Sequence, residues 1–216
     1  MRTNIRTNAS LQFSTLSPDQ IEEIVNSSLE VLEGVGMMLH SDEVVDMLKE
    51  AGATVDGQGR VHIPGYLVKR ALGTCASRIV LSGRDGSRKL VLQKDHIYYG
   101  TGSDLPFLID PHTGERRSWT YEDVYNGARL ADALPNIDFF MSYGLVSDVP
   151  PKTYDRPQFM AMVTGFSKPM IVTAVDGQGL IDQHQMACAV LGGEDRFRAN
   201  PLFGIYIEPI SPLQHS

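Results

Sequence analysis

The sequence predicts an α/β protein in which an α+β region precedes a run of parallel strand and helix units. Near-continuous apolar segments start at Ile137, Pro169 and Leu202, which are 32 and 33 residues apart, and helix-like segments lie between them. Strands that are apolar throughout are typical of a parallel sheet covered on both faces. Before them, short apolar runs in residues 78–119 alternate with Gly, Asp, Ser and Pro, which indicates a β-meander.

The N-terminal region is predicted to contain three helices. The first begins after Ser17, where Ser, Pro and Gln form a helix-start pattern, and is predicted to stop at Gly34. A second helix is expected between Ser41 and Gly52, and a third over residues 64–72. Asp and Gly pairs between the last two indicate a tight reversal joining short strands.

The later region repeats a strand and helix pattern. Helices are predicted over residues 120–134, 154–166 and 179–191, so we divide the chain into an α+β cap, residues 1–119, and βα units, residues 120–216. The spacing fits a (β/α)₈ barrel, which uses about 31 residues per unit, and it fits an open doubly wound sheet equally well. Because the third strand would leave an apolar edge, we expect the chain to be the N-terminal part of a longer protein.

Composition excludes several classes of protein. The 216 residues include 19 Lys and Arg against 26 Asp and Glu, a net charge of -7, so nucleic acid is not expected as a partner. No apolar run approaches the roughly 20 residues of a membrane span. The two cysteines, Cys75 and Cys188, lack CxxC spacing, which predicts no disulfide framework and favours a reducing cytoplasm.

The common catalytic motifs are absent from the sequence. There is no HExxH pattern, nucleophile elbow or P-loop, and the six histidines are scattered, so no metal site and no catalytic residue are predicted. The glycine-rich segment Tyr99-Gly100-Thr101-Gly102-Ser103-Asp104 follows a predicted strand. A strand rather than a helix follows it, so a hairpin turn competes with binding of a phosphate or adenosyl group.

The carboxyl ends of the three predicted parallel strands carry the candidate binding residues, because both alternative architectures place their chemistry there. Tyr143, Asp176, Tyr206 and Glu208 lie at or just after these ends. Aromatic faces beside carboxylates suit an ammonium ligand through cation–π attraction and charge pairing. The alternative interpretation is that the tyrosines are buried core residues and Glu208 is a salt-bridged strand end.

Six short motifs together carry a resemblance to a known family. They are Leu32-Glu33-Gly34-Val35-Gly36, Ala51-Gly52-Ala53-x-Val55, Tyr99-Gly100-Thr101-Gly102, Leu130-Ala131-Asp132-Ala133-Leu134-Pro135-Asn136-Ile137-Asp138, Ser147-Asp148-Val149-Pro150 and Ile207-Glu208-Pro209-Ile210-Ser211-Pro212-Leu213. Over its whole length the chain resembles the trimethylamine methyltransferase family. That family includes pyrrolysine enzymes and relatives without pyrrolysine that act on glycine betaine and other quaternary amines.

The resemblance implies a partial TIM (β/α)₈ barrel behind an N-terminal cap. It implies methyl transfer from a small methylated amine to Co(I) of a separate, cognate corrinoid protein, so the corrinoid (cobalamin) is presented by the partner and not bound tightly by this chain. Positioning and electrostatics dominate such chemistry. The expected substrate-binding residues are Glu208, Tyr206, Tyr143, Asp176 and Tyr99, and the expected partner-facing or corrinoid-facing loop residues are Gly100, Thr101, Gly102 and Asp104.

Family members are about twice as long as this chain or more. We therefore expect the chain alone to be inactive and to self-associate, and the pyrrolysine position of the trimethylamine branch to fall outside it. A quaternary amine is the favoured substrate, because relatives without pyrrolysine are the more numerous. The alternative is a non-catalytic ligand-binding or interaction module derived from a shortened paralogue, which the mass of the native protein would distinguish.

Overall fold

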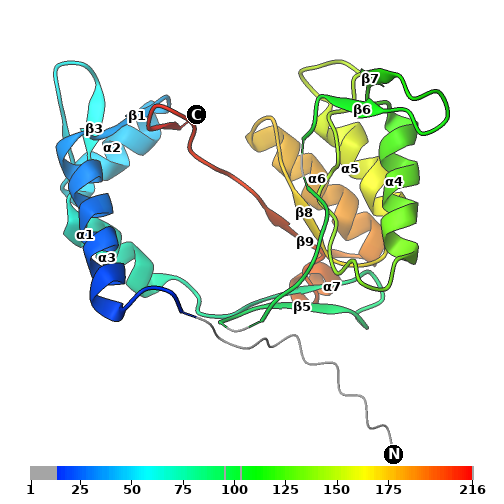
Figure 1. Ribbon diagram of the computed structural model, residues 1–216, viewed down its shortest axis with the longest axis horizontal. Helices are drawn as coiled ribbons and strands as arrows, with labels where there is room; N and C mark the ends of the chain where they lie inside the picture. Colours follow the sequence, from blue (N-terminus) through cyan, green and yellow to red (C-terminus); the bar gives the residue numbers. More distant parts are fainter. Residues whose placement is uncertain (1–13, 95, 103, 216) are drawn as a thin grey trace, which may run out of the picture. The chain divides into compact units, whose positions relative to one another are not determined.

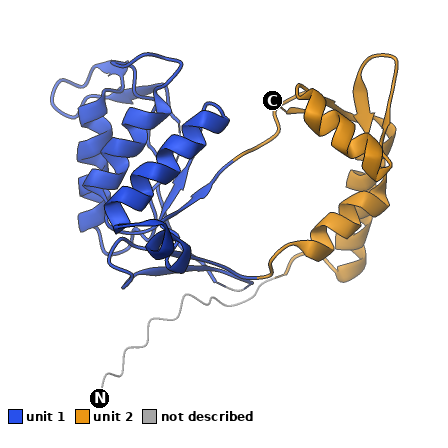
Figure 2. Ribbon diagram, turned by 180° about the vertical axis from the view of Figure 1, so that it is seen from behind, with its two compact units in different colours: residues 1–10, 78–206 blue, residues 11–77, 207–216 orange. Residues whose placement is uncertain are grey.

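The computed structural model describes residues 14–94, 96–102 and 104–215, and these form two compact units (Figure 2). The large unit contains the described residues of 78–206. The small unit contains those of 14–77 together with 207–215. The sequence-based division at residue 119, into cap and barrel, stays a prediction. None of the described helices combines the length and the apolar character that a membrane crossing requires.

The small unit is an α+β structure built mostly from local connections (Figure 1). Its elements are α1 (Pro18–Gly34), β1 (Met37–Leu39), α2 (Asp42–Ala51), β2 (Thr54–Val55), β3 (Arg60–His62), α3 (Gly65–Thr74) and β10 (Gln214–His215). The strand order is β10-β1-β3-β2, in which β10 runs parallel to β1 and the other pairs are antiparallel. The three predicted helices are confirmed, and Ser17 and Gln20 form the expected capping box.

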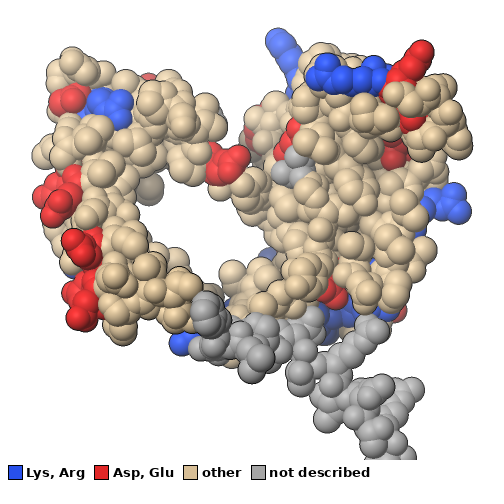
Figure 3. Space-filling model, in the orientation of Figure 1, with Lys and Arg blue, Asp and Glu red and all other residues tan. Residues whose placement is uncertain are grey.

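The small unit has a thin core and an acidic surface. Among the described residues, its buried hydrophobic side chains are Ala53, Val61 and Leu67. Helix α1 carries five Asp and Glu residues and no Lys or Arg. Acidic side chains accordingly form patches on the surface of this unit in the space-filling view (Figure 3).

The large unit begins with two separate antiparallel hairpins, in place of the single meander that the sequence predicts, and continues with alternating helices and parallel strands (Figure 1). Its elements are β4 (Ile79–Ser82), β5 (Lys89–Leu92), β6 (Phe107–Ile109), β7 (Arg116–Ser118), α4 (Tyr121–Ala133), α5 (Asp155–Gly165), β8 (Met170–Val172), α6 (Gly177–Leu191), α7 (Glu194–Ala199) and β9 (Phe203–Ile205). Helix α5 packs between α4 and α6. The predicted helices over 120–134, 154–166 and 179–191 therefore exist, with bounds shifted by a few residues.

Parallel pairing joins segments that are far apart in the sequence. Strands β8 and β9 pair in parallel from Met170 with Phe203 to Val172 with Ile205. Phe140 forms a parallel bridge to Met170, and its neighbour Phe139 forms one to Gly100. The chain thus runs in the same direction through four neighbouring segments, which confirms the predicted parallel arrangement.

The strands are shorter than predicted, and the described residues form several small sheets without a closed barrel. The segment expected over 137–141 pairs only through isolated bridges, and β9 covers 203–205 in place of 202–208. Tyr206 still donates its backbone N–H to Val172, and the chain from Ile207 onward belongs to the small unit. Ladder pairing is therefore limited by where the backbone leaves the sheet, which apolar character alone does not reveal.

Candidate functional site

A small polar cavity lies at the carboxyl ends of the parallel segments in the large unit. Its volume is about 10 Å³, which is room for about one water molecule. We call it the strand-end cavity. Its polar lining consists of Asp104, Ser142, Asp155, Gln158, Thr173 and Gln183. This is the edge of the sheet at which α/β proteins place their ligands.

Asp155, the first residue of α5, is the most enclosed charged group at the cavity. Its side chain is fully buried, and its Oδ1 accepts a hydrogen bond from Arg156 Nη1 at 3.0 Å. Its Oδ2 accepts from the backbone N–H of Val175 at 3.1 Å and from Gln183 Nε2 at 3.4 Å. A methyl group on Gly179 would overlap Asp155 Oδ2, so α6 needs glycine at this position to approach the carboxylate.

Two glutamines fix the floor of the cavity between α5 and α6. Gln183 is fully buried and donates from Nε2 to the carbonyl of Thr173 at 2.9 Å. Its Oε1 has no hydrogen-bond partner within the part of the chain that the structure describes. Gln158 is also buried, and its Oε1 accepts from the backbone N–H of Val146 at 3.4 Å. Burying amide side chains between helices is costly unless their polar atoms are hydrogen-bonded. We therefore expect a polar ligand or a water to hydrogen-bond to these glutamines.

Arg156 gathers three carboxylates beside the cavity. Its guanidinium lies 3.0 Å from Asp155, 3.1 Å from Asp176 and 3.0 Å from Asp182, and these contacts, that of Asp182 first, raise its pKa. Asp176, a predicted substrate residue, also caps α6, because its Oδ1 accepts from the backbone N–H of Gly179 at 2.6 Å. Because carboxylates outnumber cations in this cluster, the electrostatic potential at this edge of the sheet is negative.

The rim of the cavity carries the same sign of charge. Burial first, and then the carboxylates of Asp104 and Asp155, raise the pKa of the Tyr154 phenol. Asp104 adopts a positive φ of 54°, which Asp tolerates better than most residues, and donates its backbone N–H to the carbonyl of Ser142 at 2.9 Å. Negative groups that converge at a partly enclosed edge favour a cationic ligand.

The glycine-rich segment lies beside the first parallel segment. The backbone of Gly100 forms its bridge where the ring of Phe139 fills the space that a Cβ would need. Thr101 Oγ1 donates to the carbonyl of Met141 and accepts from the Met141 backbone N–H at 2.8 Å. A Cβ on Gly102 would meet nothing within 4 Å, and Tyr99 is 69% exposed. Ser103 lies outside the described residues.

The predicted residues at the strand ends are distributed differently. Tyr143 is half-buried, stacks on Trp119 with ring centroids 5.9 Å apart, and meets Phe140 edge-on at 5.2 Å. Burial raises its pKa. Tyr206 and Glu208 are both exposed; Tyr206 follows β9, and Glu208 belongs to the segment assigned to the small unit. Of the predicted residues, Asp104 lines the strand-end cavity, and a substrate role for the others stays a prediction.

Among the residues of this site that sequence reasoning missed are Tyr154, Asp155, Gln158 and Gln183. A signal was present, because Asp155 and Gln158 lie in the first turn of a predicted helix whose following residues are mostly apolar. Buried polar side chains within an apolar helix are informative in the way that exposed apolar ones are not. Their convergence on one cavity depends on the packing of α5 against α6.

The fold and the cavity define an α/β protein with parallel βα units and an acidic polar site at the carboxyl ends of its strands. The sequence model of the trimethylamine methyltransferase (MTTB) family matches residues 2–216. The chain therefore belongs to this family.

Curated relatives agree with the family match. The chain is 34% identical to "Trimethylamine methyltransferase MttB" of Desulfitobacterium hafniense strain DCB-2, over 92% of this chain and 40% of the relative. It is 23% identical to "Glycine betaine methyltransferase" of D. hafniense strain Y51, over 94% of this chain and 42% of the relative. It is 29% identical to "Trimethylamine methyltransferase MttB1" of Methanosarcina mazei, over 95% and 43%. The chain thus spans less than half the length of each of these relatives.

Proposed function

We propose that this chain is the N-terminal part of a methyltransferase that moves a methyl group from a methylated amine to Co(I) of a separate corrinoid protein. The observation that carries the proposal is the family match over residues 2–216. The acidic strand-end cavity supports a cationic substrate, and a quaternary amine is our favoured one. The coverage of 40 to 43% of the relatives supports the assignment as an N-terminal part.

The parallel segments around residues 139–140, β8 and β9 are proposed as the first strands of a TIM barrel. Support comes from their order, their common direction and the helices that connect them. A closed barrel needs about 250 residues, so further strands would be required to complete it. In this arrangement residues 1–119 serve as the N-terminal cap, and the strand-end cavity lies at the catalytic face.

The proposed transfer breaks the bond between the methyl carbon and nitrogen, whose electron pair leaves with the amine. Co(I) of the partner supplies the pair for the new bond. The chain's own groups act on the substrate: Asp104 and Asp155 attract the cationic nitrogen, and the packed aromatic cluster around Tyr143 excludes water. Since the cation loses its charge during transfer, the carboxylates contribute to binding and orienting the substrate more than to stabilising the transition state. The rate enhancement would come from holding the methyl carbon in line between the amine nitrogen and the acceptor.

The substrate would sit above the cavity and not within it. A volume of about 10 Å³ is too small for trimethylamine or a larger amine. The corrinoid would approach along the segment of residues 99–102, where the space beside Gly102 is open and Tyr99 is exposed. These features fit a bulky group carried by a partner protein.

A methyl-transfer assay tests the proposal. The complete protein is given trimethylamine and glycine betaine in turn, with Co(I) cobalamin as acceptor, and we expect transfer from one of them. Asp104→Asn should weaken amine binding by about tenfold, since a charge-assisted contact is worth about 1.5 to 3 kcal/mol. Asp195→Asn, which removes one exposed carboxylate of α7, is the matched control and should change nothing.

Three results would contradict parts of the proposal. Absence of transfer from every methylated amine would reject the activity. Amine binding without transfer would support the ligand-binding module. Unchanged affinity in Asp104→Asn, with wild-type far-UV circular dichroism, would show that this carboxylate does not bind the substrate.

A further inference from the structure

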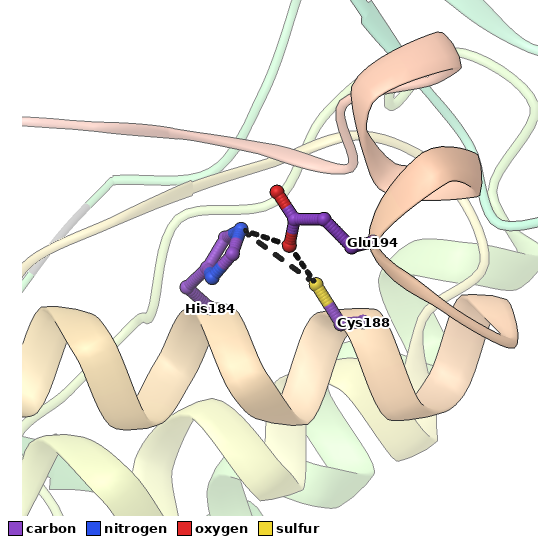
Figure 4. A group of neighbouring side chains, drawn as sticks. All are labelled: His184, Cys188 and Glu194. Carbon is purple, nitrogen blue, oxygen red and sulfur yellow. Dashed lines mark hydrogen bonds and ion pairs between the residues drawn. The ribbon is translucent and has the colours of Figure 1, made fainter.

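A second cluster of reactive side chains lies where α6 meets α7 in the large unit. Figure 4 shows His184 and Cys188 on α6 facing Glu194, the first residue of α7. One ligating atom from each residue lies within 4.8 Å of the other two. None of the three residues lines the strand-end cavity, so the cluster is separate from the proposed substrate site.

The local backbone structure brings the three side chains of this cluster together. His184 and Cys188 are four residues apart, so their side chains occupy the same face of α6. The helix ends at Gly192, whose φ of 84° is left-handed, and Gly193 follows with a φ of 133°. Both glycines donate backbone N–H groups to the carbonyl of Cys188. This turn sends the chain back over α6 and delivers Glu194 to the thiol.

The distances match the edges of a small coordination polyhedron. Cys188 Sγ lies 3.6 Å from His184 Nε2 and 3.2 Å from Glu194 Oε2, and those two atoms are 3.2 Å apart. A tetrahedral zinc ion with bonds of about 2.3 Å to sulfur and about 2.0 to 2.1 Å to nitrogen or oxygen requires edges of about 3.3 to 3.6 Å. An ion at the centre would need only small side-chain adjustments.

Neighbouring side chains hold two of these groups in orientation. Arg198 Nε donates to Glu194 Oε1 at 3.0 Å, and Oε2 is the oxygen that faces the histidine and the cysteine. The ring of Phe197 meets the imidazole of His184 edge-on, with centroids 4.7 Å apart. Such outer contacts orient ligands and are typical of built metal sites.

We propose that His184, Cys188 and Glu194 form a three-ligand zinc site that ties α7 to α6. A thiolate, an imidazole and a carboxylate are the donors that Zn²⁺ takes, whereas Mg²⁺ and Ca²⁺ prefer oxygen alone. On binding, the thiol proton passes to solvent and the sulfur–zinc bond replaces the hydrogen bond to Glu194. A water completes the fourth position. This site is independent of the methyl-transfer proposal.

Spectroscopic titration of the full chain tests the site. Under thiol-reducing conditions, Co²⁺ should bind one per chain and give a thiolate-to-cobalt band with the strong visible bands of tetrahedral cobalt, and Zn²⁺ should displace it. Cys188→Ser should abolish the thiolate band. Cys75→Ser is the matched control, because Cys75 is exposed in the small unit, and it should behave as wild type.

Removal of the other ligands should weaken zinc binding without unfolding the chain, because both side chains are partly exposed. Loss of an outer contact alone typically costs 10- to 100-fold in metal affinity, so His184→Gln and Glu194→Gln should each lose at least about tenfold. Far-UV circular dichroism verifies the fold of each variant. Absence of a thiolate band in the wild type would overturn the proposal. Equal affinity in folded Cys188→Ser, or loss of the band in Cys75→Ser, would do the same.

Discussion

The two units of this chain are stabilised in different ways. In the large unit, α4, α5 and α6 each bury side chains in one continuous apolar core that includes Phe140, Phe159 and Phe166. In the small unit, no residue of α1 or α2 is buried. Tertiary packing supplies most of the stability of helices in proteins. We therefore expect packing to stabilise the helices of the large unit more than those of the small unit.

In the small unit, side-chain to backbone hydrogen bonds position the end of α1. Arg60 on β3 donates to the carbonyls of Val35 and Gly36, at 2.9 and 2.6 Å, just after α1 ends. His62 on the same strand donates from Nδ1 to the carbonyl of Glu33 at 2.8 Å. These bonds fix the end of α1 against the sheet. The comparison shows that a helix with a clear apolar stripe can be positioned by polar contacts.

The largest expected difference between the two units is in the free energy of unfolding that each loses when a core side chain is truncated. Phe159 is 1% exposed and packs edge-on against Phe203 at 5.4 Å. Phe159→Ala should therefore cost the large unit about 3 to 5 kcal/mol, and Val61→Ala should cost the small unit about 2 kcal/mol. Trp119, the only tryptophan of the chain, lies in the large unit and reports on that unit alone in denaturant titrations.

The same denaturant titration tests whether the two units unfold independently. If the units unfold separately, Val61→Ala will shift the far-UV circular dichroism transition of the small unit and leave the fluorescence transition of Trp119 in place. An equal shift of both signals in Val61→Ala would show one cooperative unit, and the division drawn here would then have no thermodynamic meaning.

A pair of glycine variants tests how tightly the large unit is packed at its site. Gly179→Ala would place a methyl group against the buried carboxylate of Asp155, and overpacking of this kind costs about 1 to 3 kcal/mol. Gly177→Ala, two residues earlier in α6, meets nothing within 4 Å. It should be neutral or stabilising by up to about 1 kcal/mol. Equal stability of the two variants in fluorescence-monitored unfolding would mean that α6 moves freely over Asp155.

The smallest expected effect is a difference in pH dependence between the units. In the large unit, the backbone N–H of His112 first, and then Arg117, lower the pKa of Asp110 to about 2. Asp123, paired with the same arginine, also has a lowered pKa. A lowered pKa stabilises the folded state above the unfolded value of about 3.9, and that contribution is lost as the pH falls towards about 2. Arg117→Met should therefore lower stability at neutral pH and lose its effect in acid.

The small unit should respond in the opposite direction. The carbonyl of Glu33 first, and then Asp56, raise the pKa of His62. A raised pKa stabilises the folded state fully below the unfolded value of about 6.5, and the contribution disappears as the pH rises through the folded value. The deficit of His62→Gln should accordingly be larger at about pH 5.5 than at about pH 9. A deficit that grows with pH, measured by circular dichroism, would show that the ion pair with Asp56 contributes nothing.

The sequence by itself determined where most helices begin, because capping involves residues that are close along the chain. Ser17, Ser41 and Thr120, which stand at the starts of predicted helices, each accept a hydrogen bond from a backbone N–H three residues later. The parallel direction of the later strands also follows from the alternation of apolar runs with helices. These are local or periodic properties, and the structure confirms both.

Only the tertiary structure decided which polar side chains meet. Asp155 and Gln183 are 28 residues apart and become hydrogen-bond partners through the packing of α5 on α6. His184 and Cys188 read as isolated residues until the left-handed Gly192 turns Glu194 towards them. Strand length was likewise undetermined, since a backbone N–H pairs only where a neighbouring strand lies within reach. Local chemistry fixes a helix start, whereas a site depends on distances between elements, which a single sequence does not encode in any one segment.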